Sequence, residues 1–167
     1  GWVDATADFG KFYTGGTIAY ASGDGDANDD KVEDILTGGR DWNPCLIMFN
    51  YYDRAQWIGN LNGYDTTTDN GQMSNAWFFQ VRGGLRPVDK LDIMASVAYA
   101  RADKPRAILD REYGWEVDLT GTYKITNNLS YMLGMGYLFT GDYYKGINGA
   151  NSVDNNFLVI NKLTLTF

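Results

Sequence analysis

The stretch 112–125 alternates large apolar side chains with small, polar or charged ones along its whole length. The apolar row consists of Tyr113, Trp115, Val117, Leu119, Tyr123 and Ile125, interrupted only at Gly121. The other row consists of Glu112, Gly114, Glu116, Asp118, Thr120, Thr122 and Lys124. A period of two predicts a β-strand whose two faces meet very different surroundings.

The length of this stretch and the order of its side chains favour a membrane strand. Strands of soluble domains usually have about 5–6 residues, whereas about 9–11 tilted residues cross a bilayer. Aromatic side chains lie near both ends of the apolar row, as they do in the interfacial belts of membrane barrels. We therefore interpret 112–125 as a transmembrane strand with lipid on one face and a wet lumen on the other.

Six further segments repeat the alternation, at 2–9, 12–22, 76–87, 91–101, 129–140 and 155–167. Together the seven segments predict an all-β protein, an antiparallel up-and-down transmembrane β-barrel. In 129–140, for example, Leu133 and Met135 are expected to face lipid, while the opposite row is small and contains Gly134 and Gly136. The alternative is a soluble ligand-carrying barrel, which would have the opposite arrangement, with the apolar rows inside and the charges outside.

The connections between the predicted strands alternate in length. Short turns are expected at 10–11, 87–90 and 126–128, and longer polar connections at 23–75, 102–110 and 141–154. Bacterial outer-membrane barrels have short periplasmic turns and long external loops. The pattern therefore predicts one barrel domain over 1–167, with 23–75 as a long extracellular loop.

Within that loop, 45–58 is apolar but does not alternate cleanly. It predicts either an additional strand or a loop segment folded over the barrel mouth. Its tyrosines Tyr51 and Tyr52, with Trp42 and Trp57, would either line a sugar- or aromatic-binding surface or pack within the loop.

Composition excludes several classes of function. The net charge of -7, from 21 acidic and 14 basic residues, argues against a nucleic-acid partner, which requires a basic surface. The chain has no histidine, which removes His-dependent nucleophilic catalysis and His-ligated metals, so we expect no enzyme. Cys45 is the single cysteine and is expected to be a buried, packed thiol. No apolar run approaches the ~18 residues of a membrane helix.

Charged side chains on the inward rows are the candidate lumen or constriction residues. They are Arg82, Arg86, Asp92, Glu116, Asp118, Lys124 and Lys162. Basic and acidic walls would create a transverse field that orients polar solutes, and the alternative is that these charges pair and stiffen the wall. We expect these side chains to face inward because an arginine that faces lipid at mid-depth costs about 2–4 kcal/mol of free energy.

An acidic stretch in the long loop has oxygen ligands at every second position, Asp24, Asp26, Asn28 and Asp30. Calcium takes several such ligands, which makes this stretch a possible calcium site. An EF-hand loop needs glycine at its sixth position, where this chain has Asp29. The alternative is a solvated acidic loop near lipopolysaccharide, and no other cofactor is expected.

The last five residues, Leu163-Thr164-Leu165-Thr166-Phe167, resemble the C-terminal signature of Gram-negative outer-membrane proteins. That resemblance implies that Leu163, Leu165 and Phe167 form a membrane-insertion signal. The region 20–50, with AYASGDGDANDDKVEDILTGGRDW, resembles a strand end and long loop of alginate-export-type and related porin-like barrels. The resemblance implies anionic saccharides or organic acids as solutes, although a negatively charged chain is not typical of an anion channel.

Seven strands leave two free edges, which hydrocarbon does not tolerate. We therefore expect the C-terminal part of a larger barrel of about 14–18 strands, whose N-terminal strands belong to the same barrel or to another chain; the alternative is a closed eight-stranded barrel that includes 46–58. Wide barrels leave an aqueous lumen, so the expected function is an outer-membrane porin for passive diffusion of small hydrophilic solutes. The alternative is a small closed barrel with a structural or partner-binding role.

Overall fold

The computed structural model describes residues 1–25, 30–31, 33, 42–55, 73–104, 110–145 and 152–167. Its seven strands form one antiparallel sheet in the order of the sequence, each strand paired with the next. The strands are β1 (Trp2–Asp8), β2 (Phe12–Ala21), β3 (Ala76–Val88), β4 (Leu91–Ala102), β5 (Glu112–Lys124), β6 (Leu129–Thr140) and β7 (Asn156–Leu165). The all-β class, the seven strands and their up-and-down order are thus confirmed.

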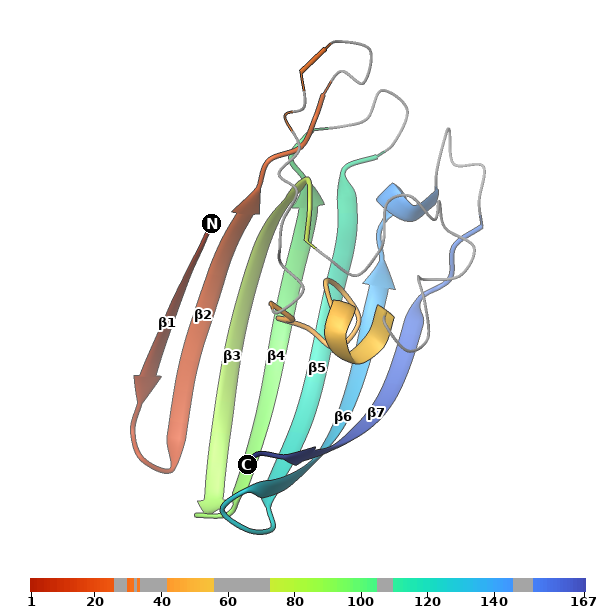
Figure 1. The fold of residues 1–167 in the computed structure, drawn as a ribbon. Coiled ribbons are helices and arrows are strands. Elements are labelled where there is room, and N and C mark those ends of the chain that lie inside the picture. The colour runs from red at the N-terminus through yellow and green to blue at the C-terminus, as the bar shows by residue number, and fades with distance from the viewer. Residues whose placement is uncertain (26–29, 32, 34–41, 56–72, 105–109, 146–151) are drawn as a thin grey trace.

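The sheet is open, with β1 at one edge and β7 at the other. In the described part of the chain two short helices accompany it: a π-helix, η2 (Tyr51–Ala55), and a 3-10 helix, η3 (Asp142–Lys145). Residues 45–55 contain no strand, so within the described residues the eight-strand interpretation is wrong. The segment Trp42–Ala55 instead lies against one face of the sheet (Figure 1). We call that face the inner face and the opposite one the outer face.

The alternation of the sequence separates these two faces. On β5, the Trp115 side chain is on the outer face and is 49% exposed, whereas the adjacent Glu116 is on the inner face and 0% exposed. Ile18, Val81, Leu133 and Leu163 are likewise exposed on the outer face. The predicted directions of these residues are therefore confirmed, and the arrangement with apolar rows inside is wrong for this sheet.

Tyr113 is an exception to the predicted outward row. It is 2% exposed, and its ring lies 4.1 Å from that of Tyr143 and 5.5 Å from that of Phe49. The register between β4 and β5 shifts at this point, so that Tyr113 is an extra residue in β5. Such a bulge reverses the direction of the side chains beyond it. The outward prediction for Tyr113 is wrong because it assumed unbroken alternation.

Gly114 makes this bulge possible, and replacing it tests the bulge. Its φ of 123° is rarely adopted by other residues, and a Cβ at this position would collide with the carbonyl oxygen of Phe139. We expect Gly114→Ala to lower the free energy of unfolding by more than about 1 kcal/mol, measured by urea titration in detergent micelles. Gly121→Ala in the same strand is the control, because its Cβ would meet no atom within 4 Å. Equal stability of the two variants would contradict a strained bulge.

The hydrophobic core lies between the inner face and the segment Trp42–Ala55. Ile47, Met48 and Phe49 of the segment are buried against Phe78 of β3 and Leu138 of β6. Small residues of β6 leave room for this contact. At Gly136, a Cβ would lie 3.1 Å from Leu46 Cβ, so the segment packs directly against the backbone of β6 at this position.

Candidate functional site

Two adjacent carboxylates of β5 hold the segment Trp42–Ala55 to the inner face. The backbone N–H groups of Ile47 and Met48 each donate to a different oxygen of Glu116, both at 2.6 Å. The N–H of Leu46 donates to Asp118 Oδ2 at 3.2 Å. All three donors are buried, and hydrogen bonds to a charged acceptor are shorter and stronger than neutral ones. β5 therefore binds three successive backbone groups of the segment.

Further contacts fix both ends of the segment. At its start, Gln80 of β3 donates to the Pro44 carbonyl at 2.6 Å. Within it, Arg54 Nε donates to the Ile47 carbonyl at 2.8 Å. At its end, Lys162 of β7 forms a 2.8 Å ion pair with Asp53. The segment is thus attached to β3, β5 and β7.

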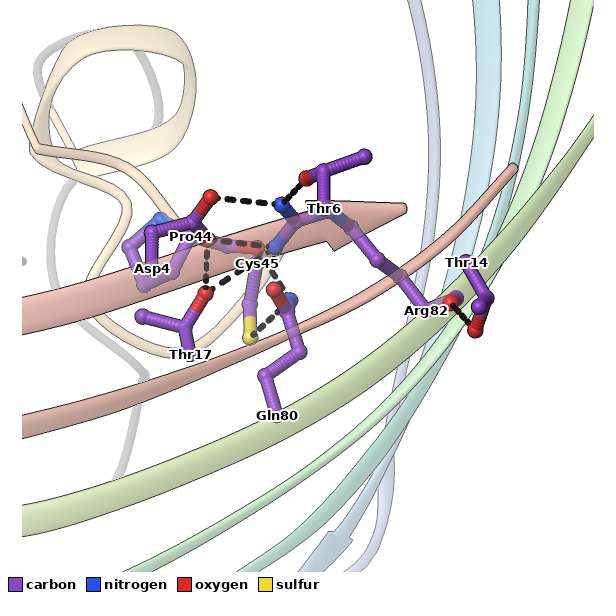
Figure 2. A network of polar contacts seen from close by, with 8 residues as sticks. All are labelled: Asp4, Thr6, Thr14, Thr17, Pro44, Cys45, Gln80 and Arg82. Carbon is purple, nitrogen blue, oxygen red and sulfur yellow. Dashed lines mark hydrogen bonds and ion pairs between the residues drawn. The ribbon is translucent and has the colours of Figure 1, made fainter. Parts of the chain in front are cut away.

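A second polar group occupies the inner face of β1 to β4. Arg82 donates to both oxygens of Asp4, at 2.6 and 2.7 Å, and also to Thr6 and Thr17 (Figure 2). A bidentate pair of this kind gives geometric specificity as well as attraction. Figure 2 shows the Arg82 side chain extending towards β1, where Asp4 and Thr6 enclose its guanidinium.

Arg86 continues this group towards the short turns. Its guanidinium pairs with Asp8 at 2.8 Å and with Asp92 at 3.2 Å. It also lies 4.5 Å from the centre of the Tyr13 ring, and the Tyr13 hydroxyl donates to Asp92 at 2.7 Å. These ion pairs are what the wall-stiffening interpretation predicts, and the transverse field stays a prediction.

Five of the seven predicted lumen residues therefore separate into two groups. Arg82, Arg86 and Asp92 belong to the ion-pair group of β1 to β4, and Glu116 and Asp118 lie buried beneath the segment. The two lysines lie apart from these groups: Lys162 binds Asp53, and Lys124 lies exposed at the end of β5. The sequence placed these charges on one face but gave no signal that the acidic pair would bind the backbone of 46–48.

Cys45 lies next to the acidic pair. Its thiol is buried, as predicted, and one ligand atom from each of Cys45, Glu116 and Asp118 lies within 4.8 Å of the other two. Gln80 Nε2 approaches the sulfur at 3.9 Å (Figure 2). Burial raises the pKa of the Cys45 thiol well above its usual value, and the charges of Glu116 and Asp118 raise it further. A neutral thiol is a poor nucleophile.

The remaining predicted sites are only partly covered by the described residues. Asp24 and Asp30 are described, but Asp26 and Asn28 lie outside the described residues, so the calcium site stays a prediction. Of the proposed insertion signal, Leu163 and Leu165 are exposed on the outer face, and Phe167 is exposed beyond the end of β7.

The loop aromatics have different environments. Trp42 packs edge-on against Phe78, with ring centres 5.3 Å apart. Tyr52 is exposed, and Lys162 Nζ lies 5.6 Å from its ring centre. Trp57 lies outside the described residues. Packing within the molecule therefore accounts for Trp42. Tyr51 is half-buried, so Tyr52 is the most exposed of the three aromatic side chains of this group that the structure describes.

No family model, curated protein or solved structure matches this chain. Among the described residues, no helix is both long enough and apolar enough to cross a membrane.

Proposed function

We propose that this chain forms part of a β-barrel in the outer membrane of a Gram-negative bacterium, and that the barrel is a channel for small hydrophilic solutes. The observation that carries the proposal is the composition of the outer face, where large apolar side chains stand exposed on all seven strands. Soluble monomers rarely expose apolar patches larger than a few hundred Å². A continuous apolar outer face over a charged inner face matches lipid on one side and water on the other.

The cross-strand register arranges the outer face in bands of different chemistry. Near the long connections, one aromatic row crosses four strands through Phe79, Tyr99, Trp115 and Phe139. In mid-sheet, one row of paired residues is aliphatic on β3 to β5, with Val81, Val97 and Val117, and continues into Tyr137 and Phe157 on β6 and β7. The next row is aliphatic throughout, with Ala95, Leu119, Met135 and Val159. Near the short turns, Tyr123 pairs with Tyr131. Two aromatic bands around an aliphatic one are typical of a membrane-spanning barrel.

Strand length and connections support the same proposal. The strands β3 to β6 have 12–13 residues each, enough to cross a bilayer when tilted. The connections after β2, β4 and β6 leave the sheet at one end, and the short turns lie at the other (Figure 1). In an outer-membrane barrel the short turns face the periplasm.

The free edges of β1 and β7 require partners in this setting. An unpaired backbone group in hydrocarbon costs several kcal/mol. We propose that further strands, from the same barrel or from another chain, pair with both edges and close a larger barrel. Its outer face would contact outer-membrane lipid and lipopolysaccharide.

Solutes would pass along the half of the inner face nearest the short turns. The polar and partly exposed side chains there include Tyr13, Asp92, Thr120 and Thr122. The segment Trp42–Ala55 covers the other half and would narrow the lumen. The solute stays open, since the resemblance to alginate-export-type barrels is its only indication.

A closed barrel with a structural or partner-binding role is the second candidate. The observation that favours it is the dry packing of the segment, where Phe49 meets Phe78 and Tyr113 at ring-centre distances of 6.0 and 5.5 Å. If the whole lumen were filled in this way, no solute would pass.

Single-channel recording in planar lipid bilayers distinguishes the two candidates. A channel is expected to give stepwise currents after insertion of the purified protein, because the polar half of the lumen admits water and ions. Resistance to extraction from vesicles shows that the protein has inserted. If inserted protein gives no currents, that result would contradict the channel and favour the filled barrel.

A further inference from the structure

We propose that Cys45, Glu116 and Asp118 bind a divalent metal ion of the zinc class. One ligand atom from each residue lies within 4.8 Å of the other two. In the tetrahedral geometry that zinc prefers, ligand atoms at about 2.0–2.3 Å from the ion are about 3.3–3.7 Å from one another. Moving the side chains about 1 Å closer together therefore brings the three groups around one ion. Nothing in this inference depends on the channel.

Asp118 supplies an independent observation. Its side chain is 3% exposed, and although Oδ2 accepts the N–H of Leu46, its buried Oδ1 atom accepts no hydrogen bond from an N–H or hydroxyl group of the described residues. The Glu116 carboxyl group is close enough to share a hydrogen bond with Asp118 only if one of the two carries a proton. A buried carboxylate oxygen normally has at least one partner. Glu116, equally buried, brings a second negative charge to the same place.

The charges of this cluster also need compensation. Neither carboxylate forms an ion pair with a basic side chain in the described part of the chain. Burying an uncompensated charge is costly, and two adjacent carboxylates cannot both remain ionised there without a cation or a proton. A divalent cation would neutralise both carboxylates and give Asp118 Oδ1 a partner.

The ligand atoms indicate which metal fits. Calcium and magnesium take oxygen ligands, whereas a cysteine sulfur favours zinc or copper(I). A set of one sulfur and two carboxylates is acceptable to zinc, which binds both kinds of ligand. The metal would displace the thiol proton, because only the thiolate is a ligand.

Neighbouring groups already hold these ligands in place. The N–H groups of Ile47 and Met48 fix the Glu116 carboxylate, and the Gln80 amide approaches the Cys45 sulfur. Partners that orient ligands in this way commonly tune a metal site. Because Cys45 is in the segment and the two carboxylates are in β5, the metal would join the segment to the sheet.

Metal titration of the purified protein in detergent tests the proposal. We expect a single equivalent of Zn²⁺ to bind, and Co²⁺ in its place to show a thiolate-to-cobalt charge-transfer absorption. Since Cys45 is the only cysteine of the chain, that absorption identifies the ligand without any variant. Asp118→Asn is expected to weaken zinc binding by at least about tenfold, and Cys45→Ser to abolish the charge-transfer band.

Asp92→Asn is the matched control, because Asp92 also lies on the inner face but is held by Tyr13 and Arg86; its zinc affinity is expected to equal that of the wild type. Absence of zinc binding, or cobalt binding without the charge-transfer band, would overturn the proposal. An infrared band of a protonated carboxyl group that persists in saturating zinc and disappears in Asp118→Asn would also overturn it. Such a band would show that Glu116 and Asp118 share a proton instead of a metal ion.

Discussion

Replacing Val117 with arginine is expected to prevent stable insertion into lipid. Val117 lies in mid-strand on the outer face, where it pairs with Val97 and Tyr137 and is 43% exposed. If this face contacts acyl chains, an arginine near the bilayer midplane costs about 2–4 kcal/mol. That cost is a large fraction of the roughly 5–15 kcal/mol that stabilises a typical protein. Urea unfolding in phospholipid vesicles, followed by tryptophan fluorescence, measures it.

Tyr123→Arg is the matched control for this prediction. Tyr123 is on the same strand and face and is 45% exposed, almost the same as Val117, but it lies at the end nearest the short turns. An arginine near the membrane interface costs only about 0–1 kcal/mol. In water both exposed positions would tolerate arginine, so an equal, small effect of the two variants would show that the outer face does not meet lipid.

Replacing Glu116 with glutamine is expected to release the segment Trp42–Ala55 and to increase single-channel conductance. Both oxygens of Glu116 accept backbone N–H groups, from Ile47 and Met48. The glutamine amide keeps one acceptor but turns an N–H group towards the other donor. Leaving a buried donor without an acceptor costs about 1–3 kcal/mol, and the attraction of the negative charge is lost as well. A segment that no longer covers the inner face no longer narrows the lumen.

Two controls separate this effect from others. Glu112→Gln changes an exposed carboxylate of the same strand and is expected to leave conductance unchanged. Cys45→Ser removes a proposed metal ligand but keeps the hydrogen bonds from Ile47 and Met48 to Glu116. A rise in conductance in Glu116→Gln that Cys45→Ser does not share would therefore result from the loss of those hydrogen bonds and not from the loss of a metal. If conductance in Glu116→Gln equals that of the wild type while the protein inserts normally, the segment does not form the constriction.

The seven strands were predictable because each has two faces with different surroundings. Strict alternation from Trp115 to Tyr123 follows directly from that difference, since a shift of one residue would exchange the two faces. The inward direction of Arg82, Glu116 and Lys162 followed from the same rule. These features depend on neighbouring residues in the sequence, which is where a periodic signal is found.

Other features depend on contacts between distant segments and have no periodic signal. The bulge that turns Tyr113 inward is marked in the sequence only by Gly114, and glycine also interrupts the row at Gly121 without a bulge. The docking of 42–55 depends on backbone N–H groups of the segment. Because nearly every residue has such a group, the sequence does not mark these as special. The small row of β6 permits either a filled or an open lumen, and nothing in the sequence indicates that Leu46 of the segment lies against Gly136.

The charged groups show the same limit. The alternation places Arg82 and Asp4 on one face. It does not indicate that Thr6 and Thr17 also accept hydrogen bonds from the Arg82 guanidinium. It likewise places Glu116 and Asp118 together without indicating that Cys45, 71 and 73 positions earlier in the numbering, would lie beside them. Pairing across such separations is decided by the folded segment, which alternation does not describe.

A barrel in the outer membrane requires contact between the outer face and lipid acyl chains, and spin labelling measures this contact directly. Nitroxide labels at Leu119 and Leu133, introduced through cysteine in a Cys45→Ser background, are placed in protein reconstituted into phospholipid vesicles. Both positions are exposed on the outer face near mid-sheet. We expect the labels to collide frequently with oxygen, which dissolves in the bilayer, and rarely with a water-soluble nickel chelate. Frequent collisions with the chelate at both positions would contradict contact between the outer face and lipid.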